Sequence, residues 1–143
     1  MRWKFIIKKA WIALFFIMIL RTLVFADEGR TVMEEVRHTI SSQIDAFKEN
    51  DVKKAYSFAA PNIQAQFPNP DIFGLMVRNG YPSIWKPKSY KFTEFKALGK
   101  TCIQRVLFQS YSGSLKSYDY ILEKNDNLWK IAGVLTITAA DET

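Results

Sequence analysis

The sequence is poor in the residues that bind metals and carry out nucleophilic catalysis. Among its 143 residues there is one cysteine, Cys102, and one histidine, His38. One cysteine cannot form an intrachain disulfide, and a lone imidazole with a distant thiol gives no ligand set of useful spacing for zinc or another transition metal. A serine or cysteine nucleophile would also depend on His38 as its base. We therefore expect no metal and no cofactor, with His38 on the surface and Cys102 as a buried, unreactive thiol.

Glycine motifs of known chemistry are also absent. The chain has no phosphate-cradling glycine-rich loop, no dinucleotide fingerprint and no G-x-S-x-G turn, and its 6 glycines fall mostly at predicted turns. These absences argue against nucleotide-dependent enzymes and against serine hydrolases of the α/β type.

Basic charge is concentrated at one end of the chain. The net charge of +6 would by itself suggest an anionic partner such as nucleic acid. Five of the 20 basic residues lie in the first 26 positions, which contain none of the 14 acidic ones, so the remainder has 15 basic against 14 acidic residues. We therefore expect no nucleic-acid partner.

The basic N-terminus has the three parts of a secretory signal. Residues 2–9 are positively charged, an apolar run of 11 residues follows from Ala10 to Leu20, and Val24-Phe25-Ala26 fits the small-residue rule for cleavage. The run is too short to span a bilayer. We expect a signal peptide over 1–26, cleaved after Ala26, and one α+β domain over 27–143, either periplasmic or secreted and free of the membrane. An uncleaved N-terminal anchor is the alternative.

Helical signals fill the first half of the predicted domain. Thr31-Val32-Met33-Glu34 has the pattern of a capping box and predicts a helix start. Apolar residues then recur at helical spacing to about Lys48, at Val32, Val36, Ile40, Ile44 and Phe47. Asn50-Asp51 predicts the cap of a second, short helix that Pro61 interrupts. Asn69 and Pro70 predict the cap and first turn of a third helix, a fixed wedge that stops near Gly80.

After Pro87 the pattern changes to alternation. Four segments rich in β-branched and aromatic residues are predicted strands, namely Tyr90 to Leu98, Thr101 to Ser110, Leu115 to Glu123 and Leu128 to Ile137. Short turns at Gly99-Lys100, Ser112-Gly113 and Asn125–Asn127 separate them. Connections this short cannot make parallel crossovers, so the strands should form an antiparallel meander. Helices followed by such a sheet predict an α+β fold with the sheet curved around the first helix.

This order of elements resembles the cone-shaped, cystatin-like folds of the nuclear transport factor 2 superfamily. Several segments are also similar to a bacterial family, domain of unknown function 4864. They are Gln43–Phe47, Ala55–Pro61, the FPNPDIF stretch with Met76-Val77 and Gly80–Pro82, and Trp129–Val134. The resemblance covers about residues 36–138 and implies the fold and export, while no activity comes with it.

The remaining catalytic chemistry is acid/base work by a carboxylate in an apolar pocket. Asp119, between two tyrosines, and Glu94, between two phenylalanines, are the candidates, and Gln104 lies within an apolar strand. If Tyr118, Tyr120 and Leu122 face inward, alternation turns Asp119 toward water. This phase has the lower free energy, because the opposite one would bury an unpaired carboxylate.

Aromatic residues make up 15% of the chain, and they either fill the core or line the mouth of the cone. The candidate pocket residues are Gln104, Tyr118, Tyr120, Trp85 and Asp119. We expect a non-catalytic module that binds a small apolar ligand or a periplasmic protein. The alternative is a cofactor-free isomerase, hydratase or lyase with a pocket carboxylate. A lysine run from Lys86 to Lys100 fits an edge strand that discourages pairing with other chains.

Overall fold

A long helix over residues 28–48 opens the part of the chain that this computed structural model describes, residues 28–138. The chain divides into two units, Met1–Val32 and Met33–Thr143. The predicted signal peptide lies outside the described residues. The predicted capping box is wrong, because residues 28–30 are already helical and Thr31 lies inside the helix. Glu28 and Arg30 are good helix formers.

Four shorter helices follow, where the sequence predicted two. They are α2 (Val52–Ser57), α3 (Pro61–Gln66), α4 (Pro70–Gly80) and α5 (Pro82–Trp85). Asp51 caps α2 by accepting a hydrogen bond from the Lys54 amide, and Asn69 caps α4 through the Asp71 amide, so both predicted caps are confirmed. The helix α2 already ends at Ser57, before Pro61, and Pro61 instead begins α3, as Pro82 begins α5. Proline suits a first helical turn because that amide has no partner there.

The four predicted strands form one antiparallel sheet in the order β1-β2-β3-β4. Their bounds are β1 (Ser89–Leu98), β2 (Thr101–Gln109), β3 (Leu115–Asn125) and β4 (Leu128–Ile137). Gly99, Gly113, Asp126 and Asn127 adopt positive φ at the turns, as their residue types predict. The lysines of β1 are exposed along an edge strand, which also agrees with the prediction.

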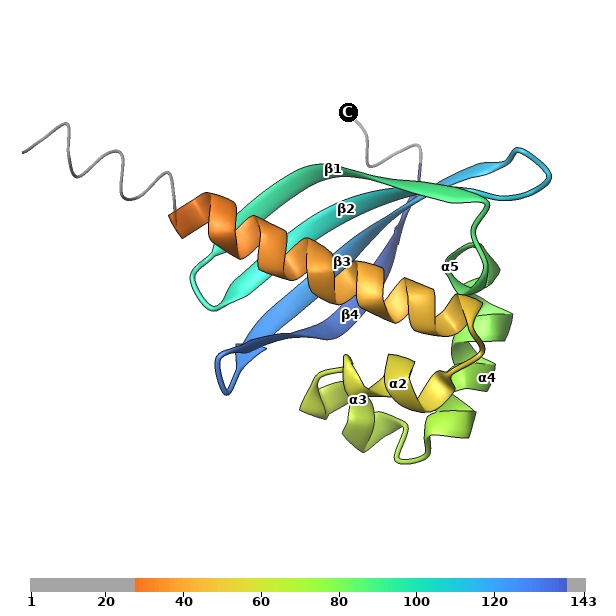
Figure 1. The fold of residues 1–143 in the computed structure, drawn as a ribbon, viewed down its shortest axis with the longest axis horizontal. Coiled ribbons are helices and arrows are strands. Elements are labelled where there is room, and N and C mark those ends of the chain that lie inside the picture. The colour runs from red at the N-terminus through yellow and green to blue at the C-terminus, as the bar shows by residue number, and fades with distance from the viewer. Residues whose placement is uncertain (1–27, 139–143) are drawn as a thin grey trace, which may run out of the picture. The chain divides into compact units, whose positions relative to one another are not determined.

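The core lies between the first helix and one face of the sheet. Residues 33–48 of the helix cross that face, while α4 and α5 lie at its C-terminal end and α2 and α3 turn back below it in the view of Figure 1. The helix buries Val36, Ile40, Ile44 and Phe47, and strands β2 and β3 bury every second residue, including Val106, Phe108, Tyr118, Tyr120 and Leu122. Full burial of each such side chain stabilises the fold by about 1.5–3 kcal/mol. The predicted phase of β3, with both tyrosines inward, is confirmed.

The helices α2 and α4 approach each other closely at Gly74, in the middle of α4. A Cβ atom at this position would lie 2.6 Å from Val52 Cγ1 of α2. We expect Gly74→Ala to lower the free energy of unfolding by about 1–3 kcal/mol through overpacking, less the ~1 kcal/mol that alanine adds in a helix. Urea unfolding of the variant and the wild type measures the difference.

Gly80→Ala is the matched control, since it lies in the same helix and a Cβ there would meet nothing within 4 Å. We expect it to change stability by no more than about 0.5 kcal/mol. Combining Gly74→Ala with Val52→Ala should recover part of the loss, because the second change removes the clashing methyl group. Equal stabilities of Gly74→Ala and Gly80→Ala would contradict this account of the α2 and α4 contact.

Candidate functional site

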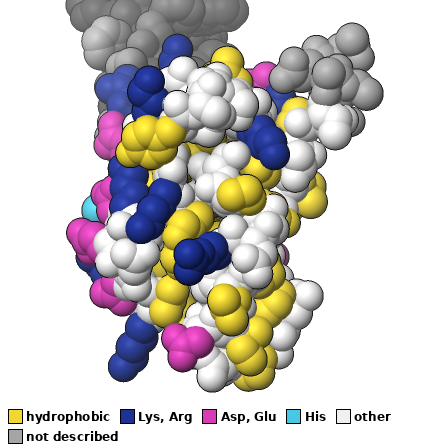
Figure 2. Space-filling model, turned by 90° about the vertical axis from the view of Figure 1, so that its right-hand side faces the viewer, with side chains coloured by type: hydrophobic (Ala, Val, Ile, Leu, Met, Phe, Trp, Pro, Cys, Tyr) yellow, Lys and Arg dark blue, Asp and Glu magenta, His cyan; other side chains and the backbone are white. Residues whose placement is uncertain are grey.

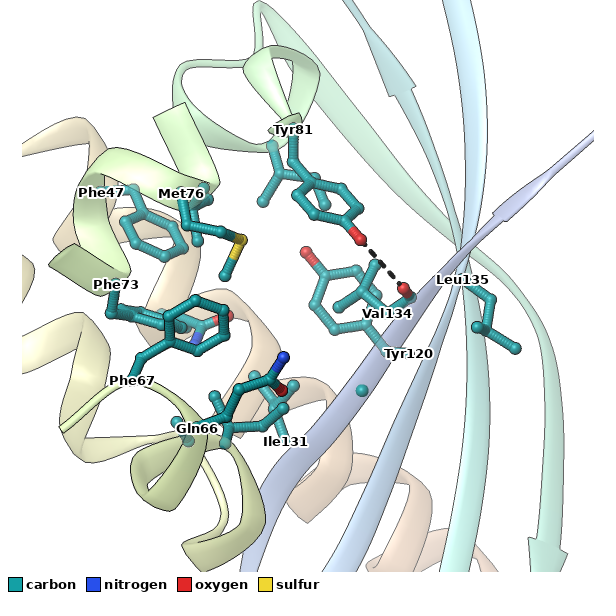
Figure 3. Close-up of a pocket in the computed structure, with 16 residues that line it drawn as sticks. Phe47, Gln66, Phe67, Phe73, Met76, Tyr81, Tyr120, Ile131, Val134 and Leu135 are labelled. Atoms are coloured by element: carbon teal, nitrogen blue, oxygen red, sulfur yellow. Dashed lines mark hydrogen bonds between the residues drawn. The ribbon is translucent and has the colours of Figure 1, made fainter. Parts of the chain in front are cut away.

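A cavity of about 280 Å³ lies between the small helices and the sheet. Figure 3 draws its 16 lining residues, which come from the first helix, α3, α4, α5, β3 and β4 and from the connections between them. Its walls are almost entirely apolar, with Phe47, Phe67 and Phe73 as the rings and Met76 and Ile131 among the aliphatic groups. None of the described residues that line it carries a charge. Such a cavity favours an uncharged, apolar occupant.

The innermost polar group of the cavity is the phenol of Tyr120 on β3. Tyr120 is 0% exposed, and its hydroxyl has no hydrogen-bond partner among the described residues. Figure 3 shows the hydroxyl turned toward the helical side of the cavity. Burial raises the pKa of Tyr120 well above its usual value, helped by the nearby Tyr118 and Tyr90. The phenol therefore stays protonated at neutral pH and offers a free donor.

Three other polar side chains line the cavity. Tyr81 donates from its hydroxyl to the Val134 carbonyl over 3.4 Å, a long and weak bond. Gln43 is buried and donates to the Ala55 carbonyl over 3.2 Å, which fixes its amide at the helical wall. Gln66 and Leu135 are exposed and mark the place where the cavity meets solvent. Tyr120 is thus the one buried group of these four whose side chain has no hydrogen-bond partner among residues 28–138.

Local sequence signals hold the cavity walls in place. The Asn69 cap and Pro70 start α4, and this helix then presents Phe73, Met76 and Val77 to the cavity. On the opposite wall, two backbone hydrogen bonds join the connection between α2 and α3 to β4. The Ala60 amide donates to the Ile131 carbonyl over 2.8 Å, and the Ile131 amide donates to the Phe58 carbonyl over 2.9 Å. These backbone bonds leave the cavity with little room to close by collapse.

Of the five predicted pocket residues, Tyr120 lines this cavity and the other four lie elsewhere. Gln104 is 0% exposed, and its amide is fully engaged by Arg37 and by the carbonyls of Glu94 and Arg105. Tyr118 is buried against Tyr81, with ring centroids 5.9 Å apart, and does not line the cavity. Both residues therefore pack in the core.

Trp85 lies at a separate hollow on the outside of the helical group. It packs on Phe47, with centroids 5.2 Å apart, and shares the hollow with Val52, Leu75 and Arg78. Figure 2 views the molecule from the side that α4 and α5 occupy in Figure 1, and hydrophobic side chains reach the surface there among lysines and arginines. This hollow is shallow and bordered by charges of both signs, so it has little of the character of an apolar ligand site.

Both carboxylates considered for acid/base chemistry lie away from the cavity. Asp119 alternates with the inward Tyr118 and Tyr120, and its two oxygens accept from Arg105 Nε over 2.8 Å and Nη2 over 3.1 Å. Glu94 is 59% exposed and lies 3.3 Å from Arg105 Nη1. The group forms an ion-pair cluster on the outer face of the sheet, where bidentate pairing ties β2 to β3.

Most of the cavity lining was missed by reasoning from the sequence. Ile63 and Gln66 belong to α3, a helix that was not predicted, and Phe67 follows it. The proline at position 61 was the available signal, because proline is common at the first helical position. Within residues 28–138, no three His, Cys, Asp or Glu side chains gather closely enough to hold a metal ion, and no helix is long and apolar enough to cross a bilayer.

Comparison with known proteins supports the fold and supplies no reaction. Residues 30–143 match the model of a family described as Domain of unknown function (DUF4864). No protein of curated function matches the chain.

Two solved structures resemble this one. An NTF-2 like protein of unknown function from Shewanella oneidensis MR-1 aligns with a TM-score of 0.52 and 15% identity, over 73% of this chain and 97% of that one. A Campylobacter jejuni protein provisionally described as an NTF2-like transpeptidase aligns with a TM-score of 0.49 and 16% identity, over 68% and 97%. The first likeness supports an NTF2-like fold, as the order of elements predicted.

Proposed function

Because the chain belongs to the DUF4864 family, which comes with no reaction, we propose from the site alone that the protein binds a small apolar molecule in the cavity between its helices and its sheet. The observation that supports this proposal is an apolar cavity with one buried, unpartnered donor, the Tyr120 hydroxyl. A buried polar group without a partner costs about 1–3 kcal/mol. A ligand that accepts a hydrogen bond from this hydroxyl removes the cost. A hydroxyl with no role in binding would only destabilise the fold.

The size of the cavity sets the size of the ligand. Its volume of about 280 Å³ lies between ~150 Å³, which holds one benzene ring, and the ~300–1,000 Å³ of sites for drug-sized ligands. At roughly 30 Å³ per water-sized group, the occupant has on the order of ten buried non-hydrogen atoms. A fused pair of rings or a medium-length alkyl chain fits this size.

Catalysis by a pocket carboxylate has less support. Asp119 and Glu94 lie on the outer sheet face with Arg105, and no described residue of the cavity is acidic. A binding role therefore accounts for the site better than an isomerase, hydratase or lyase does.

Binding of naphthalene, a neutral probe of suitable size, tests the proposal. We expect it to shift the methyl NMR signals of Met76, Val134 and Ile63, which line the cavity. Gln66→Trp should weaken binding at least tenfold, because Gln66 is exposed and turned into the cavity mouth, where an indole would occupy the entrance (Figure 3). Ala65→Trp is the matched control, since Ala65 is exposed on the same helix but does not line the cavity. Unchanged cavity signals in the wild type would overturn the proposal.

The same proposal includes a location. The protein acts outside the cytoplasm after removal of residues 1–26, which is supported by the basic stretch, apolar run and small-residue junction of the N-terminus. Mass spectrometry of protein from the host cell envelope or medium should then find a chain that starts at Asp27. A chain that retains residues 1–26 would instead indicate an N-terminal anchor.

A further inference from the structure

We infer that the ligand of this cavity is an uncharged molecule whose apolar body carries one hydrogen-bond acceptor, such as a ketone, ester or amide carbonyl, and that Tyr120 donates to this acceptor. The inference deepens the proposed function and rests on it. It begins from the one fully buried polar side-chain atom of the cavity lining that has no hydrogen-bond partner among the described residues, the Tyr120 hydroxyl.

The acceptor is required because the protein cannot satisfy Tyr120 by itself. The side chain is 0% exposed, and none of the other described polar groups at the cavity bonds to its hydroxyl. Tyr81 donates to the Val134 carbonyl, Gln43 donates to the Ala55 carbonyl through its Nε2, and Gln66 is exposed. A water molecule would be poorly held, since an ordered buried water typically makes about three hydrogen bonds. An acceptor on the ligand supplies the missing partner.

The ligand is uncharged because the walls offer nothing to compensate an ion. No described lining residue is basic or acidic, so a buried carboxylate would exchange its hydration for a single neutral hydrogen bond. Desolvation of an ion far outweighs one such bond. An ammonium group fares no better, since no described lining residue is acidic and its buried charge would stay unbalanced.

The ligand therefore enters with its acceptor first and its apolar body among the aromatic rings. The ring of Phe73 packs against those of Phe47 and Phe67, with centroids 6.1 and 6.3 Å apart. Figure 3 shows these three rings on the helical side of the cavity. Any further polar part of the ligand would lie toward Gln66 and solvent. This orientation separates the ligand class from simple hydrocarbons and from fatty acids that bury only their tails.

Three naphthalene derivatives of nearly equal size test the inference. They are 2-acetylnaphthalene, which has a carbonyl acceptor, 2-isopropylnaphthalene, which has none, and 2-naphthoate, which is charged. We expect the wild-type protein to bind the ketone about tenfold more tightly than the hydrocarbon, as one hydrogen bond to a buried donor predicts. Naphthoate should bind more weakly than either. The carbonyl stretch of the bound ketone should move to lower frequency.

Tyr120→Phe is the decisive variant. We expect it to remove the tenfold preference by weakening the ketone alone, while its melting temperature rises by about 3–6 °C because an unsatisfied hydroxyl has been removed. Tyr118→Phe is the matched control, since Tyr118 is inward on the same strand but does not line the cavity. This variant should prefer the ketone by the same factor as the wild-type protein.

The outcomes separate this inference from the proposed function. Equal binding of ketone and hydrocarbon, or a preference for the ketone that survives in Tyr120→Phe, overturns the role of Tyr120 and leaves an apolar binding site. Tight binding of naphthoate overturns the neutral ligand class. Failure of all three compounds to bind overturns the proposed function itself.

Discussion

Replacing Phe47 by alanine is expected to lower the free energy of unfolding by about 3–5 kcal/mol, the usual cost of removing a fully buried aromatic ring. Phe47 is 1% exposed, and its ring lies 6.1 Å from that of Phe73 and 5.2 Å from that of Trp85. Its ring therefore packs the first helix against both α4 and α5. Since small domains are stable by only about 5–15 kcal/mol, the loss leaves a marginal fold. Urea denaturation followed by circular dichroism measures it.

Two comparisons make this prediction specific. Phe47→Leu keeps most of the buried volume and should cost less than half as much, while Tyr111→Ala removes an aromatic ring that is 79% exposed and should change stability by no more than about 0.5 kcal/mol. Benzene should restore part of the stability of Phe47→Ala, because a cavity left by a large side chain in an apolar core can bind it. A loss below about 1.5 kcal/mol would mean that the helices do not depend on this ring.

The parts of the fold that could be predicted depend on neighbouring residues. The Asn69 cap and its proline define α4, and the turns at Gly99 and Gly113 need only a residue that tolerates positive φ. Alternation on β3 gave the inward phase of Tyr118 and Tyr120 because burying the lone Asp119 would have been costly. Each of these inferences uses physics that acts over a few residues.

The parts that were missed depend on distant segments. Pro61 was taken to interrupt a helix and no helix was predicted after Gly80, but Pro61 and Pro82 each begin a helix that is held by contacts with the rest of the domain. The capping-box pattern at Thr31 is locally reasonable, yet the helix extends further toward the N-terminus. Neither outcome can be read from a short window, because helix propensity is weak and is overridden by its surroundings.

The candidate site shows the same division. The sequence could place Tyr120 on the inner face of the sheet. It could not show that the hydroxyl is left without a hydrogen-bond partner in the described part of the chain, because the residues around the cavity come from six separate elements. Gln104 was predicted to line the pocket but lies in the core. It was a reasonable pocket group, yet its side chain meets Arg37, 67 positions away, and so serves the core. Hydrogen-bond partners of this separation leave no local pattern in the sequence.

Gln104 is therefore expected to matter for stability rather than for binding, and we expect Gln104→Leu to lower the free energy of unfolding by about 2–4 kcal/mol. Its Nε2 donates to the carbonyls of Glu94 and Arg105 over 2.9 and 2.8 Å, and its Oε1 accepts from Arg37 over 3.0 Å. Leucine fills a similar volume, so the cost comes from three part-buried groups that lose their partner, each at about 1 kcal/mol, the low end of the range for a buried group.

The position of Gln104 explains why these bonds cannot be replaced. The β1 and β2 pairing is irregular between Phe92 and Phe95, and the Glu94 carbonyl there is bonded by the Gln104 amide. A bulge disrupts the regular ladder locally. Gln104→Leu should therefore speed hydrogen exchange of the β1 amides around Thr93 more than that of β3 and β4, and it should leave naphthalene binding unchanged, because Gln104 does not line the cavity.

The matched control is Gln109→Leu, the same change on the same strand. Gln109 makes one exposed bond to Ser89, so its replacement should alter stability by no more than about 0.5 kcal/mol. Combining Gln104→Leu with Arg37→Met should cost less than the sum of the two single changes by about 1 kcal/mol, because the partners share one part-buried bond. Additive losses would mean that Arg37 finds water when Gln104 is gone, and the two β1 and β2 carbonyls would then account for the whole effect.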